Sequence, residues 1–151
     1  MPHHYTASVE IAHPLTDLFA YFIRPKNLVQ LAPSELNLEL LTAPEILTLG
    51  SLLHWKGRRF GVSQQFTHQV SAFESEKLIV LEQKKGPFAR WIHRHQFDAT
   101  DTGTKITERI DFDPPGGLLG YVITADGIRK DLDKLMAHRE KKLKEIFDIP
   151  R

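Results

Sequence analysis

Apolar and polar residues alternate at the start of the chain and then take up a helical spacing. The alternation over Tyr5–Ala12 predicts a strand with one buried face. Residues 13–23 carry apolar side chains at helical spacing, and Pro14 suits a first helical turn. Residues 24–33, bracketed by two prolines, predict a second short helix. The chain therefore begins with one strand followed by two short helices.

The long middle section returns to period two, which is typical of strands in an antiparallel sheet. A hairpin turn is expected around Gly57–Arg58, and Thr100–Gly103 has the composition of a tight turn. In the arm after the first of these turns, one face carries Phe60, Val62, Gln64, Phe66, His68 and Val70. The predicted strands are Leu36–Leu41, 50–57, 58–73, 77–86, 88–99 and 104–113.

Residues 114–117, two prolines and two glycines, end the strand section. A long helix with one apolar stripe follows, and its other face is rich in Lys, Asp and Glu. The stripe consists of Ile128, Leu132, Leu135, Met136, Leu143, Ile146 and Phe147, with Leu118, Tyr121, Val122 and Ala125 extending it upstream. We therefore expect the helix to begin just past the glycines. This order of elements predicts an α+β fold in which a curved sheet closes over the long helix.

The hairpin around Thr100–Gly103 has an unusual inner face. Alternation in the first arm puts two histidines and two aromatic residues on one side. A four-residue turn would pair Trp91 with Phe112, His93 with Ile110, His95 with Glu108 and Phe97 with Ile106. A shift of one residue would expose both aromatic residues to water, so this register is favoured. The pattern predicts a cross-strand His95–Glu108 pair on a largely apolar wall.

Arg139 is a second unexpected polar residue, because it falls within the apolar stripe of the long helix. An isolated buried guanidinium is too costly to leave unpaired, and Glu108 is the obvious carboxylate partner. Gln64 and His68 add polar groups on the inward face of another strand. This many inward polar groups predict a cavity that holds a partly polar ligand or water rather than an ordinary core.

Composition limits the classes of function. A length of 151 residues favours one domain, 1–151. With 20 basic and 19 acidic residues the net charge is +1, so we expect no nucleic-acid partner. The absence of cysteine excludes disulfides, thiolate catalysis and iron–sulfur clusters. The chain shows no secretion signal or membrane-spanning run, so we expect a cytoplasmic protein without integral membrane association.

The chain resembles the START-related, helix-grip ligand-binding superfamily (SRPBCC), which includes polyketide cyclases and lipid- or quinone-binding proteins. The resemblance rests on "PLTDLFAYFIRPKNLVQLAPSEL", "GPFARWIHRHQF", "ITERIDFDPPGGLLG" and "LMAHREKKL" and spans nearly the whole sequence. It implies a seven-stranded antiparallel sheet around the C-terminal helix, with a hydrophobic cavity between them. One departure is Glu108, where the family pattern has an aspartate. The family implies no single chemistry.

We therefore expect a protein that binds a small, mostly hydrophobic ligand, such as a lipid, an isoprenoid or quinone, or an aromatic polyketide-like molecule. The alternative is a cyclase- or dehydratase-like enzyme, with His95 as base and Glu108 as its orienting carboxylate. A further alternative is a protein-interaction module with a vestigial cavity. The candidate ligand-binding residues are Gln64, Phe66, His68, Trp91, His93, His95, Phe97, Glu108, Phe112 and Arg139.

No cofactor or metal is expected. His93 and His95 resemble half of a metal site, and Glu108 or His68 would be a third ligand. Arg139 on the same side would compete for the carboxylate and repel a cation. His3 and His4 are interpreted as an exposed terminus rather than a metal-binding tract. The sequence leaves the oligomeric state open.

Overall fold

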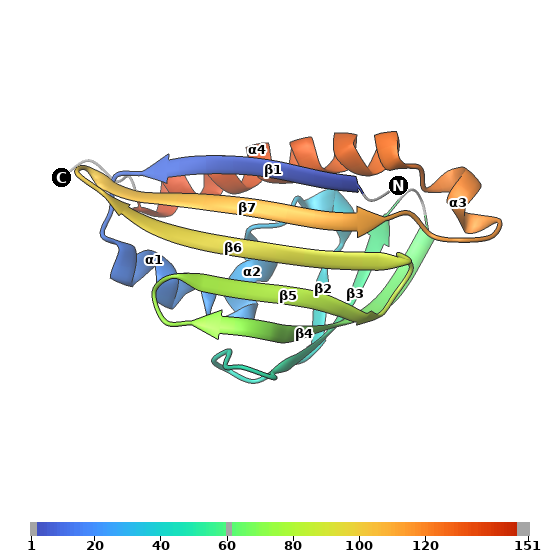
Figure 1. The fold of residues 1–151 in the computed structure, drawn as a ribbon, viewed down its shortest axis with the longest axis horizontal. Coiled ribbons are helices and arrows are strands. Elements are labelled where there is room, and N and C mark those ends of the chain that lie inside the picture. Colours follow the sequence, from blue (N-terminus) through green and yellow to red (C-terminus); the bar gives the residue numbers. More distant parts are fainter. Residues whose placement is uncertain (1–2, 60–61, 148–151) are drawn as a thin grey trace.

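A computed structural model describes residues 3–59 and 62–147. Seven strands and a few helices follow one another along this part of the chain (Figure 1). The elements are β1 (His3–Ile11), α1 (Leu15–Phe22), α2 (Pro25–Gln30), η1 (Ser34–Leu36), β2 (Glu39–Thr42), β3 (Leu52–Arg59), β4 (Val62–Glu74), β5 (Leu78–Lys85), β6 (Arg90–Thr100), β7 (Gly103–Asp113), α3 (Leu119–Val122) and α4 (Ala125–Phe147).

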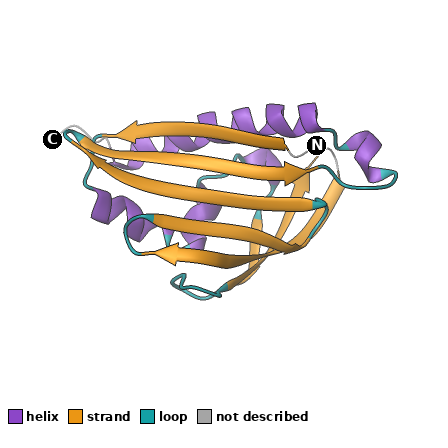
Figure 2. Ribbon diagram, in the orientation of Figure 1, coloured by secondary structure: helices purple, strands orange, loops and turns teal. Residues whose placement is uncertain are grey.

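The strands form one antiparallel sheet in the order β1-β7-β6-β5-β4-β3-β2. The sheet curves, and the helices lie on its inner side, with α4 running beside β1 and β7 (Figure 2). Ile128, Leu132 and Leu135 of α4 are buried against Ile110 and Phe112 of β7. The predicted α+β helix-grip fold, with a seven-stranded sheet around the C-terminal helix, is confirmed.

The β6–β7 hairpin has the predicted register. His95 pairs with Glu108, and the turn closes with Thr100 opposite Gly103. Gly103 must be glycine, because a Cβ there would collide with the backbone oxygen of Ile11. A turn of favourable composition and a strict alternation of buried residues together determine this pairing.

Three predicted boundaries in the strand section are wrong. His3 and His4 belong to β1, where His3 stacks on Phe112 with 5.5 Å between ring centroids. The predicted strand Leu36–Leu41 is not continuous. Leu36 ends a 3-10 turn, Asn37 has a left-handed backbone with φ of 44°, and β2 begins only at Glu39. The β3–β4 turn follows Arg59 rather than Gly57–Arg58, since the ladder continues to that residue. The predicted inward side chain of Phe60 lies outside the described residues.

The C-terminal helix begins later than predicted. α3 ends at Val122, and the extended backbone of Ile123 breaks the helical path. The hydroxyl of Thr124 then accepts a hydrogen bond from the Gly127 amide at 3.1 Å. The stripe therefore does not continue upstream, and Leu118 and Tyr121 are exposed. Within α4, Ile128, Leu132, Leu135 and Leu143 of the stripe are buried together with Arg139, as predicted, while Met136, Ile146 and Phe147 are partly buried. No helix in the described part of the chain is long and apolar enough to span a membrane.

Candidate functional site

A cavity of about 130 Å³ lies between the sheet and the helices. Its walls are mostly apolar and aromatic, with a few polar side chains. The lining residues are Leu28, Ala32, Leu36, Leu38, Trp55, Gly57, Arg58, Gln64, Phe66, His68, Leu81, Gln83, Pro87, Phe88, Trp91, His93, His95, Leu135 and Arg139. Arg58 is exposed and marks the outer rim, whereas His93, His95 and Arg139 are buried and form the inner end.

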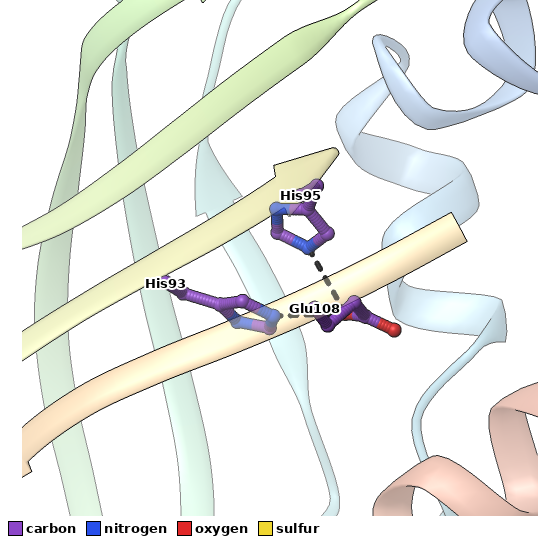
Figure 3. Close-up of side chains that lie close together, drawn as sticks. All are labelled: His93, His95 and Glu108. Carbon is purple, nitrogen blue, oxygen red and sulfur yellow. Dashed lines mark hydrogen bonds and ion pairs between the residues drawn. The ribbon is translucent and has the colours of Figure 1, made fainter. Parts of the chain in front are cut away.

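The polar inner end is built by three elements. Alternation on β6 puts His93 and His95 on the same face, and their rings stack with centroids 3.9 Å apart. β7 places Glu108 beside them, as Figure 3 shows. α4 supplies Arg139 from the other side of the core. Four polar side chains from segments far apart in the sequence therefore meet in one buried cluster, which we call the polar cluster.

One oxygen of Glu108 is the centre of the polar cluster. Its Oε1 lies 2.8 Å from His93 Nε2 and 3.3 Å from His95 Nε2 (Figure 3), and it also accepts from Arg139 Nη1. The predicted cross-strand pair of His95 and Glu108 is present, and a shorter contact comes in addition from His93, the diagonal neighbour. The glutamate side chain is long enough to reach past the residue directly opposite.

The electrostatics of the polar cluster favour a charged Glu108 and a neutral His95. Burial by itself would raise the pKa of Glu108, but the Arg139 guanidinium and the hydrogen bond from His93 lower that pKa well below its ordinary range. Burial is the main cause that lowers the pKa of His95 well below its ordinary value, and the adjacent His93 lowers it further. The charge of Arg139 is therefore balanced inside the protein by Glu108.

Each ring nitrogen of His95 faces an oxygen that only accepts. Its Nδ1 lies 3.3 Å from the backbone oxygen of Ile79, and its Nε2 lies 3.3 Å from Glu108 Oε1. A neutral imidazole carries one proton, so it donates to only one of these two oxygens. Arg139 Nη1 lies 3.5 Å from the same Nε2 and also contacts Glu108, so the guanidinium lies against both the imidazole and the carboxylate.

His93, His95 and Glu108 also offer three metal-ligating atoms within 4.8 Å of one another. Two imidazoles and a carboxylate are a ligand set that suits zinc. The position of Arg139 opposes this use, because its guanidinium donates to the same Glu108 oxygen that faces both imidazoles. A divalent cation bound there would lie against the buried positive charge of Arg139 and would have to displace it from Glu108. The two imidazoles and the carboxylate therefore do not fit a resident metal.

The structure separates the candidate residues into two groups. Gln64, Phe66, His68, Trp91, His93, His95 and Arg139 all line the cavity. Phe97 instead packs edge-on against Phe19 and Phe22, and Phe112 lies in the core beneath α4. Glu108 is not among the described lining residues of the cavity. It borders a second pocket, between β1 and α4, together with Arg139.

Sequence reasoning missed part of the wall. Trp55 on β3 lines the cavity but was not predicted to do so. Its alternation with Leu53 and Gly57 along the strand could have indicated that it points inward. Leu36 and Leu38 were assigned to a strand, but they lie in and after the 3-10 turn and reach the cavity from there. Gln83 is held by hydrogen bonds to the Phe88 backbone and shapes the β5–β6 turn at the rim.

Comparison with solved structures supports the fold. The Zhui aromatase/cyclase from Streptomyces sp. R1128 matches with a TM-score of 0.75 and 13% identity over 98% of this chain and 94% of that one. A START superfamily protein from Mycobacterium smegmatis matches with a TM-score of 0.73 and 15% identity over 97% of both chains. The major latex-like protein 151 from Panax ginseng matches with a TM-score of 0.67 and 15% identity over 94% of this chain and 97% of that one. At these identities the similarity shows the fold alone.

The sequence comparisons identify the family. Two uncharacterized proteins of Mycobacterium tuberculosis, MT0096 and Rv0088, are each 30% identical in an alignment of 145 positions that covers 89% of this chain. The chain spans 63% of the length of these relatives. The model of the family described as "Polyketide cyclase / dehydrase and lipid transport" matches residues 11–138. Together with the helix-grip fold, this match shows that the chain belongs to the polyketide cyclase/dehydrase and lipid transport family, within the START-related superfamily.

Proposed function

We propose that the protein binds a small, mostly hydrophobic ligand in the cavity between the sheet and α4. The observation that carries this proposal is the composition of the wall, which is mostly apolar and aromatic and has three polar side chains together at its buried end. Such a cavity binds through apolar contact and orients its ligand through a few fixed polar groups. His93, His95 and Arg139 are the groups that would orient the polar end of the ligand.

The size of the cavity restricts what it encloses. A volume of about 130 Å³ is close to that of an apolar cavity of roughly 150 Å³ that holds benzene. One ring or a short branched chain fits without rearrangement. A lipid, an isoprenoid or an aromatic polyketide-like molecule would therefore place one end beside the polar cluster and extend outward past the rim at Arg58.

Native mass spectrometry of gently purified protein, followed by organic extraction, tests this proposal. We expect a co-purifying apolar molecule that the His95→Ala variant retains more weakly. Arg94→Ala is the matched control, because Arg94 lies on the exposed face of the same strand and should leave retention unchanged. A cavity that retains no molecule and admits no apolar probe would contradict the proposal, and a retained zinc ion would contradict the interpretation of the polar cluster.

A second candidate function is acid/base chemistry of the cyclase or dehydratase type. His95 Nε2 lies 3.3 Å from the Glu108 carboxylate, which would orient the imidazole and stabilise the imidazolium after proton uptake. The name of one structural neighbour, an aromatase/cyclase, points to the same class of reaction. Arg139, already paired with Glu108, would be the adjacent cation that stabilises developing negative charge.

Turnover of the extracted molecule separates the two functions. An enzyme should change the mass of that molecule, with a bell-shaped dependence of rate on pH, and His95→Gln should abolish turnover while binding remains. A binding protein should return the molecule unchanged at every pH. A protein that retains only another polypeptide would favour the interaction-module alternative, for which the exposed Leu118, Tyr121 and Val122 offer an apolar surface.

A further inference from the structure

One oxygen of the Glu108 carboxylate has no hydrogen-bond donor in the described part of the chain. His93, His95 and Arg139 all contact Oε1. Figure 3 shows the second oxygen, Oε2, pointing away from both imidazoles. Glu108 is only 3% exposed, and an ionised carboxylate accepts hydrogen bonds at both oxygens. Oε2 is therefore an acceptor left open on a buried residue.

This oxygen still has contact with solvent. Within the described residues, the fully buried side-chain polar atoms without a partner are Nε1 of Trp55 and Nε of Arg139. Oε2 of Glu108 is not one of them, so it is not fully buried. Glu108 does not line the ligand cavity as described, but it does line the second pocket, between β1 and α4. Solvent therefore reaches Oε2 from the second pocket.

Small side chains keep the second pocket open. Ala7 of β1 lies directly opposite Glu108 in the β1–β7 ladder, and Ala137 lines the pocket from α4. The volume is about 210 Å³, which is enough for several water molecules at about 30 Å³ each. Among the described lining residues, the pocket shares only Arg139 with the ligand cavity. The polar cluster therefore separates two compartments.

Charge restricts what can bind at the inner end of the second pocket. An ionised carboxylate oxygen needs a donor, which excludes an anion without hydrogens. A cation would lie close to the guanidinium of Arg139, which already contacts the same carboxylate. Glu140, at the exposed rim, is paired with Lys144 at 3.1 Å and adds no unpaired charge. A small neutral donor fits this site, and water is the simplest one.

We propose that the second pocket is a water-filled entrance through which the polar cluster exchanges protons with bulk solvent, separately from the ligand cavity. A hydronium ion in the pocket transfers a proton to Oε2 of Glu108, which leaves water and a neutral carboxyl. Rotation about the Cγ–Cδ bond turns that proton toward the imidazoles, and the reverse steps return it. The polar cluster thus gains or loses a proton without release of a ligand from the cavity.

The absence of cysteine from the chain allows the second pocket to be blocked reversibly at one position. Ala7→Cys puts a thiol in the pocket, and methyl methanethiosulfonate adds a methylthio group that a reducing agent removes. Thr6→Cys is the matched control, because Thr6 is the adjacent, exposed residue of β1 and is not among the described lining residues. Ala137→Cys places the same block on α4.

The readout is exchange of the His93 ring proton with water, measured by nitrogen–proton NMR with saturation of the water signal. Nε2 of His93 lies 2.8 Å from an oxygen of the ionised Glu108, which only accepts, so Nε2 carries this proton. His93→Gln assigns the signal by removing it.

Labelling of Ala7→Cys should slow this exchange by about tenfold or more, because the exchange is then limited by local opening of the fold. Reduction of the label should restore the original rate. Labelled Ala137→Cys should slow the exchange too, and labelled Thr6→Cys should exchange like the wild-type chain. A label that loosened the fold would speed the exchange, so damage to the fold does not produce the expected result.

Benzene in the ligand cavity gives the complementary measurement. An apolar cavity of roughly 150 Å³ holds benzene, and this cavity has a volume of about 130 Å³. Saturating benzene should leave the exchange of the His93 ring proton unchanged, because the second pocket stays open.

Three results would overturn the separate entrance. Slower exchange with benzene but not with labelled Ala7→Cys would mean that protons enter through the ligand cavity. Slower exchange in both cases would mean that the two compartments share one route. No slowing in either case would mean that exchange requires opening of the fold. If benzene did not enter the cavity, the proposed binding function would lose its support, while the cysteine block would still test the entrance.

Discussion

The two sides of the cavity satisfy their polar groups in opposite ways. At the inner end, Glu108 Oε1 is contacted by His93, His95 and Arg139. On the β3 wall, the indole N–H of Trp55 is buried without an acceptor among the described residues. Most polar atoms of the polar cluster thus have a partner within it, with the Nε of Arg139 as an exception, whereas the indole N–H on the β3 wall has none. The two sides of the cavity therefore depend on polar contacts to different degrees.

Removing Arg139 should have the largest effect on stability. Arg139→Met keeps much of the side chain's length and apolar surface but leaves the Glu108 carboxylate buried without its cation. We expect a loss of about 3–5 kcal/mol in the free energy of unfolding, measured by urea denaturation, because an uncompensated buried charge is strongly unfavourable. A loss of this size is a large part of the stability of a typical domain.

The double variant Arg139→Met/Glu108→Gln isolates the cause of that loss. It removes both charges, so it should be more stable than the single variant, by about 2 kcal/mol or more. Arg94→Met, on the exposed face of β6, is the control and should change stability by less than about 0.5 kcal/mol. If the double variant were no more stable than Arg139→Met, the polar cluster would not be held by its charges.

Acid should weaken the polar cluster through two groups that act in the same direction. In the unfolded chain His95 gains a proton below its ordinary pKa of about 6.5, but burial lowers the pKa of the folded residue well below that value. Glu108 also lowers the stability as the pH falls, at lower pH values than His95. Its carboxylate takes up a proton in the unfolded chain at a pH at which it is still charged in the folded protein. The unfolded state then binds more protons, so the free energy of unfolding falls as the pH falls.

Urea denaturation at pH 7.5, 6.0 and 5.0 tests this dependence. His95→Gln removes the titrating imidazole and should make the decline in stability over this range shallower than in the wild-type chain. Arg94→Gln, on the same strand, should keep the wild-type slope. An unchanged slope in His95→Gln would show that burial of the neutral imidazole is not a source of the acid sensitivity.

The sequence was most informative where local rules act together. The β6–β7 hairpin has a favourable turn and a strict alternation, and these determine every predicted pair from Trp91–Phe112 to Phe97–Ile106. The burial of Arg139 followed from its place in the stripe of α4. The hydrogen bond from His93 to Glu108 did not follow, because the pairing of backbones does not determine where a long side chain ends.

Sequence reasoning was weakest where the path of the chain depends on tertiary packing. Leu118 and Tyr121 fit the helical spacing of α4, but the break at Ile123 and the cap at Thr124 separate them from it and leave them exposed. Phe97 satisfied the alternation of a cavity wall, yet α1 covers it through Phe19. Periodicity indicates that a residue points inward, and packing decides whether it meets a cavity or the core.

The β3 wall should show the smallest effect on stability. Trp55→Phe removes an indole N–H that has no acceptor among the described residues, so no hydrogen bond is lost. The cost of the smaller ring is offset by removal of a buried unpaired donor, and we expect the free energy of unfolding to change by less than about 1 kcal/mol. Urea denaturation without added ligand measures this value.

Thr104→Val is the contrasting variant, because it removes a buried donor that does have an acceptor. The Thr104 hydroxyl donates to the His13 backbone oxygen at 2.8 Å, and valine keeps its shape. Loss of this hydrogen bond should lower the free energy of unfolding by about 1–2 kcal/mol, since the His13 carbonyl is left without its donor. A larger loss in Trp55→Phe than in Thr104→Val would mean that the Trp55 ring is chiefly structural. The expected order instead would show that the indole N–H contributes less to stability than the Thr104 hydroxyl.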